Sequence, residues 1–394
     1  MVYNIYEEYG MDNNFIILDF GKVYIVWEND ERKFYKEDNG RFVSLSFDEF
    51  KIVSSLFNKS KHDNYYSERI NSILSNNNDI DNKEFVINFL NFLESIIPEN
   101  CRDNFYRNLE TVKIKLNFDT DFLNSQTNES SFLKVGNYNV KYNIFHMEQS
   151  YLKRLWEIAQ KNSNSEDFFW KEVCLDILHE LSHMASSRYD SDTNISYCGF
   201  DKYPYTKQSD GNRGITEGMT EVIAMTGVPN TIEISSGYYI EASFINQLMQ
   251  ILGRDVIIES YFSNKGTIEL EKELDKYQSD FLNSKLLFRR IEDNFYLKDF
   301  DGKQGLLAGI QSDLIEYYGN KLLYCIRNGL MSIDEVNQSL YVYESVLITS
   351  QKIKLMMKNA DNYIGLGDSV EKFYSVRKKI NEELLLFSNK CITK

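Results

Sequence analysis

Residues 174–187 read CLDILHELSHMASS, and this stretch decides how the middle of the chain folds. Its apolar residues recur at the spacing of an α-helix, so we predict a helix over residues 167–187. Positions i and i+4 lie on one helical face, which brings His179 and His183 side by side. Glu180 follows directly and is turned about 100° around the helix from His179. The stretch therefore predicts a helix that can present two imidazoles to one ion.

This pattern is the HExxH motif, in which two histidines bind zinc and the glutamate takes a proton from water that the metal activates. The alternative is a surface helix that carries two histidines by chance. The chain has only 4 histidines in 394 residues, which disfavours chance. The opposite helical face carries an apolar stripe suited to packing against a sheet. The stripe consists of Val173, Cys174, Ile177, Leu178, Leu181 and Met184. We therefore expect a buried back and a solvent-facing front that binds the cation.

A catalytic zinc site takes three protein ligands and leaves a fourth position for water. The other histidines, His62 and His146, both precede the motif, so a downstream third ligand must be a carboxylate. The sequence GITEGMTEVIA supplies Glu217 and Glu221 one helical turn apart. We expect Glu217 to be the third ligand and Glu221 to accept the free ring N–H of a ligand histidine. The alternative, an acidic pair on a solvated helix face, is disfavoured by the apolar VIAM sequence that follows.

The composition limits the partners of such a site. A net charge of −15 and a sequence pI of about 4.9 argue against nucleic acid and against an anionic membrane surface. The 5 cysteines include no CxxC pair, which is typical of a reducing compartment. The N-terminal sequence does not resemble a secretory signal, and no stretch approaches the roughly 20 apolar residues of a transmembrane helix. We therefore expect a cytoplasmic protein, with export by a non-classical route left open.

Polar breaks predict three parts and an α+β fold. Residues 1–75 form a small β-rich module of short hairpin strands, followed by a helix at LSFDEFKIVSSLF. Residues 76–235 form the catalytic core, with a mixed sheet, a predicted strand at 138–147 beside the site, and the motif helix. Residues 236–394 form a mainly helical C-terminal lobe. The polar, aromatic connection at 186–214 is long enough to be a functional segment or a hairpin flap.

HELSH followed by TEGMTE resembles the gluzincin group of zinc metallopeptidases, which includes thermolysin-like enzymes and aminopeptidases of the same fold. That group pairs HExxH with a downstream Asn-Glu-x-x-Ser/Thr-Asp/Glu motif. By this match Glu217 stands at the metal-ligand position and Glu221 at the acid behind a ligand histidine. Thr216 replaces the usual asparagine, which leaves the ligand pattern intact. The match covers about residues 170–225 and implies a zincin-like fold, Zn²⁺ as cofactor, and a peptide or protein substrate.

The resemblance also implies a mechanism in which Glu180 is the general base and passes its proton to the leaving amine. The group generally stabilises the oxyanion with a Tyr or His from the C-terminal lobe, and no histidine follows the motif here. We choose Tyr239 as this catalytic residue, with its neighbour Tyr238 left open. Three tyrosines of the connection stay open as well: Tyr197, Tyr203 and Tyr205.

Three further residues have two interpretations each. Arg213 is a candidate for binding a substrate carboxylate, or an ordinary surface arginine at a helix start. Glu148, in HMEQ, faintly resembles the aminopeptidase segment that holds a free amino terminus, and is otherwise a helix residue. Cys198 is the more exposed cysteine near the site, but no His/Asp context supports a cysteine nucleophile.

The leading hypothesis is a zinc metallopeptidase with its substrate extended along residues 138–147. The first alternative is a catalytically inactive zincin-fold protein with a binding or regulatory role, which the presence of Glu180 disfavours. The second is a toxin or effector protease with a single protein substrate. The unfamiliar flanking regions favour this second alternative, and the missing export signal opposes it.

Overall fold

The computed structural model describes residues 15–16, 23–28, 31–38, 41–45, 67–116, 137–147, 151–153, 155, 157, 165–203, 211–228, 238–297, 300–356 and 367–392. The chain forms two compact units, each built from separate stretches. The motif unit comprises Lys59–Tyr238 and Ile258–Gly266, and the second unit comprises Met1–Asn58, Tyr239–Ile257 and Thr267–Lys394. The division at Tyr238 lies close to the predicted start of the C-terminal lobe, and the three-part division stays a prediction. Among the described helices, none has the length and apolarity needed to span a bilayer.

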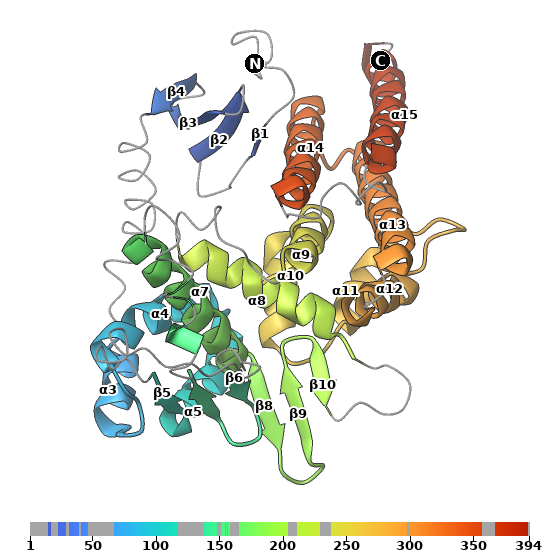
Figure 1. Ribbon diagram of the computed structural model, residues 1–394. Coiled ribbons are helices and arrows are strands. Elements are labelled where there is room, and N and C mark those ends of the chain that lie inside the picture. The colour runs from blue at the N-terminus through green and yellow to red at the C-terminus, as the bar shows by residue number, and fades with distance from the viewer. Residues whose placement is uncertain are drawn as a thin grey trace. The chain divides into compact units, whose positions relative to one another are not determined.

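Helices dominate the motif unit (Figure 1). They are α3 (Glu68–Asn76), α4 (Lys83–Ile96), the 3₁₀ turn η1 (Glu99–Cys101), α5 (Arg102–Thr111), α7 (Ser165–Ala185) and α8 (Arg213–Gly227). The predicted helix over 167–187 is therefore confirmed as α7. Its apolar stripe is buried, except that Cys174 is partly exposed. We expected the apolar stripe of α7 to pack against a sheet, and this prediction is largely wrong. Helix α7 packs chiefly against the helices α8, α5 and α4, and it also contacts strand β6.

The predicted mixed sheet is present and small, with strands β5 (Lys113–Lys115), β6 (Asn137–Asn139) and β7 (Ile144–His146). Its order is β5-β7-β6, with β5 parallel and β6 antiparallel to β7. The prediction of one strand over 138–147 is wrong, because the chain reverses after Asn139 and returns as β7. Asn143 adopts a left-handed φ of 51°, which asparagine tolerates better than most residues. Strand β6 lies at the edge of this small sheet and contacts α7, so a strand does lie beside the motif helix, as predicted.

An antiparallel meander directly follows α7, which confirms the hairpin interpretation of the connection. It contains β8 (Ser187–Asp190), β9 (Ile195–Cys198) and β10 (Asp201–Tyr203), in the order β10-β9-β8. Gly199, between β9 and β10, has a φ of +57°. The meander returns the chain to the C-terminal end of α7, since Ser187 pairs with Cys198 across the sheet.

The second unit begins with β1 (Phe15–Ile16), β2 (Val23–Glu28), β3 (Glu31–Asp38) and β4 (Arg41–Leu45). These strands pair antiparallel in chain order, which confirms the predicted hairpins. The helix predicted at LSFDEFKIVSSLF lies outside the described residues.

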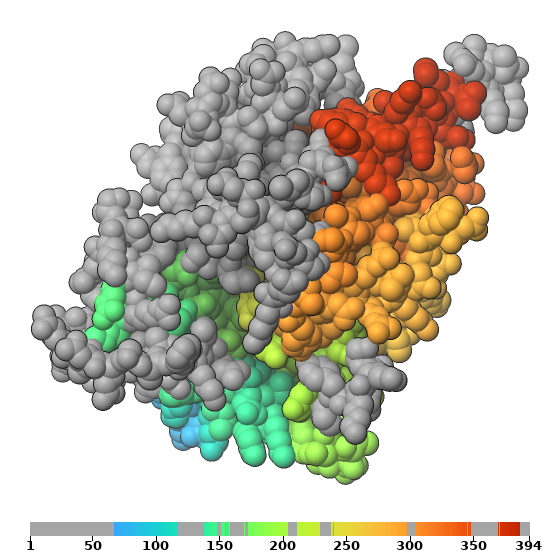
Figure 2. Space-filling model, turned by 45° about the vertical axis from the view of Figure 1, so that its right-hand side comes forward, coloured from blue at the N-terminus to red at the C-terminus, as the bar shows by residue number. Residues whose placement is uncertain are grey.

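The rest of the second unit is helical, as predicted for the C-terminal lobe. Its helices are α9 (Tyr239–Leu252), the start of α10 (Arg254–Phe262), α11 (Ile268–Leu274), the 3₁₀ turn η4 (Asp275–Tyr277), α12 (Ser284–Tyr296), α13 (Phe300–Arg327), α14 (Ile333–Met356) and α15 (Gly367–Ile392). Helices α13 and α15, orange and red in Figure 2, pack against each other. Tyr318 and Tyr343 stack in the core with ring centroids 3.8 Å apart. The described residues thus form an α+β protein that is mostly helical.

Candidate metal centre

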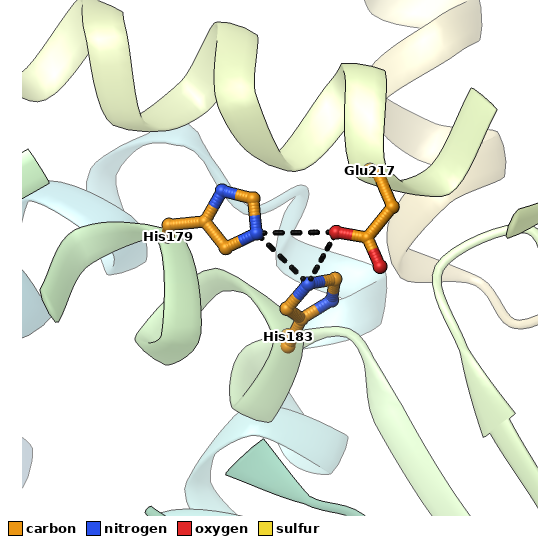
Figure 3. A group of neighbouring side chains, drawn as sticks. All are labelled: His179, His183 and Glu217. Atoms are coloured by element: carbon orange, nitrogen blue, oxygen red, sulfur yellow. Dashed lines mark hydrogen bonds and ion pairs between the residues drawn. The ribbon is translucent and has the colours of Figure 1, made fainter. Parts of the chain in front are cut away.

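Helices α7 and α8 bring two imidazoles and one carboxylate to a single point (Figure 3). The Nε2 atoms of His179 and His183 lie 3.2 Å apart, and each lies 3.2 Å from Oε2 of Glu217. The three residues are only 8%, 9% and 6% exposed. In the described part of the chain, they are the one group of three or more His, Cys, Asp or Glu residues placed to hold a metal ion. The predicted ligands therefore converge, although on a more buried site than the solvent-facing front that we expected.

The spacing of these three atoms fits a small tetrahedral cation. Zinc bonds of about 2.0–2.1 Å to nitrogen and oxygen place neighbouring ligand atoms about 3.3–3.4 Å apart. The observed triangle has sides of 3.2 Å, so it matches one face of that tetrahedron. Two imidazole lone pairs and a carboxylate oxygen cannot satisfy one another at this distance without a cation or protons between them. The donor set therefore suits a zinc ion.

The pKa values of the site residues follow from the close approach of these charged and ionisable groups. Burial alone lowers the pKa of His179, but hydrogen bonds to Glu217 and Glu221 outweigh it and raise the pKa to about 9. Burial also disfavours the charged form of His183, yet Cys198 and Glu217 raise its pKa well above the usual value. Burial would raise the pKa of Glu217, but the two rings hold it well below 4.5. The carboxylate thus stabilises positive charge at this point of the structure.

Glu221 lies behind the first histidine, as the sequence predicts. Its Oε2 lies 3.0 Å from Nδ1 of His179, and the residue is only 3% exposed. A carboxylate can only accept here, so Nδ1 of His179 carries a hydrogen, and in the neutral ring Nε2 keeps its lone pair. This arrangement orients the ring towards His183 and Glu217.

Arg213 has a role that neither sequence interpretation anticipated. It is the first residue of α8, and its Nε donates to Oε1 of Glu217 at 3.2 Å, one helical turn away. The guanidinium therefore holds the outer oxygen of the carboxylate, while Oε2 faces the two rings. Arg213 is half-exposed, so this ion pair is open to solvent on one side.

Glu180 is anchored by the edge strand. Its Oε2 accepts the backbone N–H of Tyr138, in β6, at 2.7 Å. Burial raises the pKa of Glu180, and the two histidines and the Tyr138 N–H act in the opposite direction. Because this N–H of β6 is already engaged, an extended substrate along the strand would have to pair with other backbone groups.

The structure places Tyr238 at the site. Its ring stacks on the His179 ring, with centroids 5.4 Å apart and planes inclined by 16°. Burial raises the pKa of the Tyr238 hydroxyl, which therefore stays protonated at neutral pH. Tyr239 begins α9, but its side chain lies outside the described residues, so its catalytic role stays a prediction.

Two tyrosines of the connection lie on strands of the meander that follows α7. Tyr197, on β9, lies under the guanidinium of Arg188, and Tyr203, on β10, is exposed. Tyr205 and Glu148 lie outside the described residues, so the roles considered for them stay predictions.

The contact between Cys198 and the second histidine was not predicted from the sequence. The Sγ atom lies 3.2 Å from Nδ1 of His183. Thr216, the residue before Glu217, accepts the N–H of Phe200 at 3.1 Å and donates to the Cys198 carbonyl at 3.4 Å. The only sequence signal was a predicted hairpin between the motifs, which gives no register and therefore no partner for the thiol.

A row of acidic residues on α7 was also missed. Glu172 and Asp176 precede Glu180 at intervals of four residues, and the Tyr151 hydroxyl donates to Oδ2 of Asp176. Burial, with repulsion from Asp176 and Glu221, raises the pKa of Glu172 to about 8. Burial raises the pKa of Asp176 to about 7. This face of α7 is therefore polar but not solvated.

Comparisons with known proteins do not extend the motif resemblance. No protein-family model matches this chain. No curated protein matches it, and no solved structure does. The site is therefore characterised by its own geometry: two imidazoles and a carboxylate from neighbouring helices, each with a further partner that orients it.

Proposed function

We propose that this protein is a zinc-dependent metallopeptidase of the gluzincin type, with a zincin-like fold. The observation that carries the proposal is the convergence of His179, His183 and Glu217 at mutual distances of 3.2 Å. The HExxH glutamate on the same helix and the edge strand β6 beside it support a hydrolytic rather than a purely structural site. A structural zinc site has four protein ligands, whereas this one has three in the described residues.

Each residue of the site then has a role that its contacts support. His179, His183 and Glu217 hold Zn²⁺, which when bound supplies Lewis acidity towards water and a substrate carbonyl. Glu180 is the general base that receives the proton of the attacking water and delivers it to the leaving amine. The Tyr138 N–H fixes one oxygen of Glu180 and so orients the carboxylate. Arg213 holds Glu217 as a ligand through one oxygen.

The substrate class follows from the chemistry and the charge of the chain. We infer a peptide or protein substrate in a cytoplasmic setting. The net charge of −15 supports a partner other than nucleic acid or an anionic membrane surface. The 5 cysteines without a CxxC pair support a reducing compartment.

The test compares zinc content with peptide cleavage. Wild-type protein should bind one zinc per chain, measured by mass spectrometry of the metal, and should cleave members of a peptide library. Glu180→Gln should keep the zinc and lose roughly 10²–10⁴-fold in turnover, because proton transfer contributes about that much. His183→Ala and Glu217→Ala should lose both. Glu110→Gln, which changes an exposed acid on α5, is the matched control and should keep both.

Two outcomes would contradict the proposal. Protein that binds no zinc at any concentration tested would refute the metal site and the activity together. Stoichiometric zinc with no cleavage of the library would favour the inactive binding protein or the protease with a single substrate.

A further inference from the structure

The two ligand histidines are oriented by chemically different partners. Nδ1 of His179 meets a carboxylate oxygen of Glu221 at 3.0 Å, whereas Nδ1 of His183 meets the thiol of Cys198 at 3.2 Å. A neutral imidazole carries one hydrogen, so the partner of one ring nitrogen decides whether the other has a lone pair for a metal. The Cys198 thiol is therefore placed to determine which ring nitrogen of His183 carries the hydrogen.

The direction of these contacts follows from a second bond of the same sulfur. The Cys198 thiol donates to the backbone carbonyl of His183 at 3.8 Å. The single S–H is thus directed at the carbonyl, and a lone pair of the sulfur faces Nδ1. With the S–H so directed, Nδ1 donates to the sulfur, and in the neutral ring Nε2 keeps its lone pair, 3.2 Å from Oε2 of Glu217.

The position of the sulfur is determined by the surrounding fold. Ser187 pairs with Cys198 between β8 and β9, and the Ser186 carbonyl accepts the N–H of Gly199 at 3.2 Å. From the other side, Thr216 on α8 bonds the backbone on both sides of Gly199. A Cβ atom at Gly199 would lie 2.5 Å from Cε2 of Tyr261, so the turn cannot shift towards that ring. The segment that directly follows α7 and helix α8 therefore hold Cys198 against His183.

Cys198 lies on the side of the ring away from the metal site. It contacts Nδ1, whereas the candidate ligand atom is Nε2, and the group placed to hold a metal does not include it. The contact is therefore that of an orienting group and not of a fourth ligand.

We propose that Cys198 is a positioning residue that fixes His183 in the tautomer with its hydrogen on Nδ1. This inference rests on the proposed metal function of His183. The thiol takes the place that Glu221 takes for His179, so one ligand histidine is oriented by a carboxylate and the other by a thiol. Metal affinity then depends on an acceptor at residue 198 as well as on the three ligands.

The test measures zinc affinity by competition with a chromophoric chelator in four full-length proteins. Cys198→Ala removes the acceptor and should weaken zinc binding about 10- to 100-fold, the usual loss when such a partner is removed. Cys198→Ser keeps both a donor and an acceptor and should stay within about threefold of wild type. Cys174→Ala is the matched control, because it removes a thiol from the apolar stripe of α7, and its affinity should be unchanged.

A spectroscopic readout separates positioning from loss of folding. Nitrogen-15 NMR of the chelated, zinc-free proteins, at a pH at which the ring is neutral, should show His183 with its hydrogen on Nδ1 in wild type and Cys198→Ser, and a mixture of the two tautomers in Cys198→Ala. Circular dichroism shows whether each variant folds. If Cys198→Ala does not fold, Cys198→Ser still tests the inference, because a large loss of zinc affinity in the folded serine variant would contradict it.

Other results would also overturn it. Equal zinc affinity and an unchanged His183 tautomer in folded Cys198→Ala would refute the positioning role, while the proposed function would stand. A thiolate-to-cobalt absorption band in cobalt-loaded wild type that disappears in Cys198→Ser would make Cys198 a ligand instead. Wild-type protein that binds no zinc would refute the proposed function, and this inference with it.

Discussion

Each candidate ligand has its own orienting group, supplied by a different part of the chain. Glu221 serves His179 from α8, Cys198 serves His183 from β9, and Arg213 serves Glu217 from the first turn of α8. Buried polar groups need such partners, because a polar group that is buried without a hydrogen bond has lost its hydrogen bonds to water and destabilises the fold. Metal sites that lose these partners typically lose about 10- to 100-fold in affinity or activity. The arrangement therefore supports a site that is ordered before the metal binds.

Tyr238 allows ring stacking to be separated from hydroxyl chemistry. Tyr238→Phe keeps the ring over His179, so zinc affinity should be unchanged, while turnover should fall if the hydroxyl stabilises the oxyanion. Tyr238→Ala removes the ring and should lower zinc affinity roughly two- to tenfold, since an aromatic pair contributes about 0.5–1.5 kcal/mol. Chelator competition and steady-state kinetics on both variants measure the two effects. Equal zinc affinity in the alanine variant would show that the stacked ring does not hold His179.

Glu172 predicts a pH dependence of stability. Its pKa is about 8 in the folded protein and about 4.3 in an unfolded chain. Between these values the folded protein holds a proton that the unfolded chain releases, so the free energy of unfolding falls as pH rises. The stabilising contribution of Glu172 is complete below about pH 4.3 and is lost as pH rises through about 8.

Urea unfolding between pH 5 and 9 measures this effect. The free energy of unfolding should decline less steeply with pH in Glu172→Gln than in wild type, and Glu110→Gln should behave as wild type. Parallel declines in all three proteins would exclude Glu172 as the source.

At the scale of elements, α7 and α8 form one buried pair. α7 carries the apolar stripe on one side and the site on the other, and most residues of α8 from Gly214 to Ala224 are buried. Neither helix is amphipathic in the simple sense, because buried polar residues occupy the faces that would normally meet water. Their spacing at the far end depends on Gly227, where a Cβ atom would lie 2.2 Å from Leu178 and 2.7 Å from Phe92.

Gly227→Ala should therefore push α8 away from α7 and α4. We expect a loss of about 1–3 kcal/mol in the free energy of unfolding, the usual range for overpacking. Gly305→Ala is the matched control, since a Cβ atom on that exposed position of α13 meets none of the described residues within 4 Å. It should be neutral or stabilising by up to about 1 kcal/mol. Chemical unfolding measures the free energy of unfolding of both variants. Equal values would mean that α7, α8 and α4 accommodate the added methyl group at residue 227 without loss of stability.

At the scale of the whole molecule, the candidate site lies within the motif unit. The ligands come from helices separated along the chain by the β8–β10 meander, so a bound ion would join α7 to α8 and stabilise the folded state. This link between ligand binding and folding is a thermodynamic requirement for any ligand that prefers the folded protein.

Metal removal should therefore lower the melting temperature. At free zinc about 100 times the Kd, binding adds about 2.7 kcal/mol, which corresponds to roughly 5–10 °C for a unit of this size. Calorimetry of wild-type protein with zinc and after chelation should show this shift, and His183→Ala should show none. A shift of the same size in His183→Ala would place the bound metal elsewhere.

The sequence alone determined the features that depend on short-range spacing. Helical geometry places His179 next to His183, and Glu217 one turn from Glu221, whatever the rest of the chain does. The hairpin strands near the N-terminus and the helical C-terminal lobe follow from local alternation and periodicity in the same way. The convergence of the two glutamates on the two histidines was predicted from the motifs, and the distances in the structure agree with it.

Tertiary structure alone decided which residues meet across long stretches of chain. The contacts of Cys198 with His183 and of Tyr138 with Glu180 depend on the register of short strands, which local patterns do not specify. The reversal after Asn139 was missed because an alternating run reads equally well as one strand or as two. Burial of the acidic row on α7 was missed because the residues that cover a helix come from elsewhere in the chain. Helical spacing is a property of the backbone, whereas these contacts are properties of packing, and packing is settled only when the whole chain has folded.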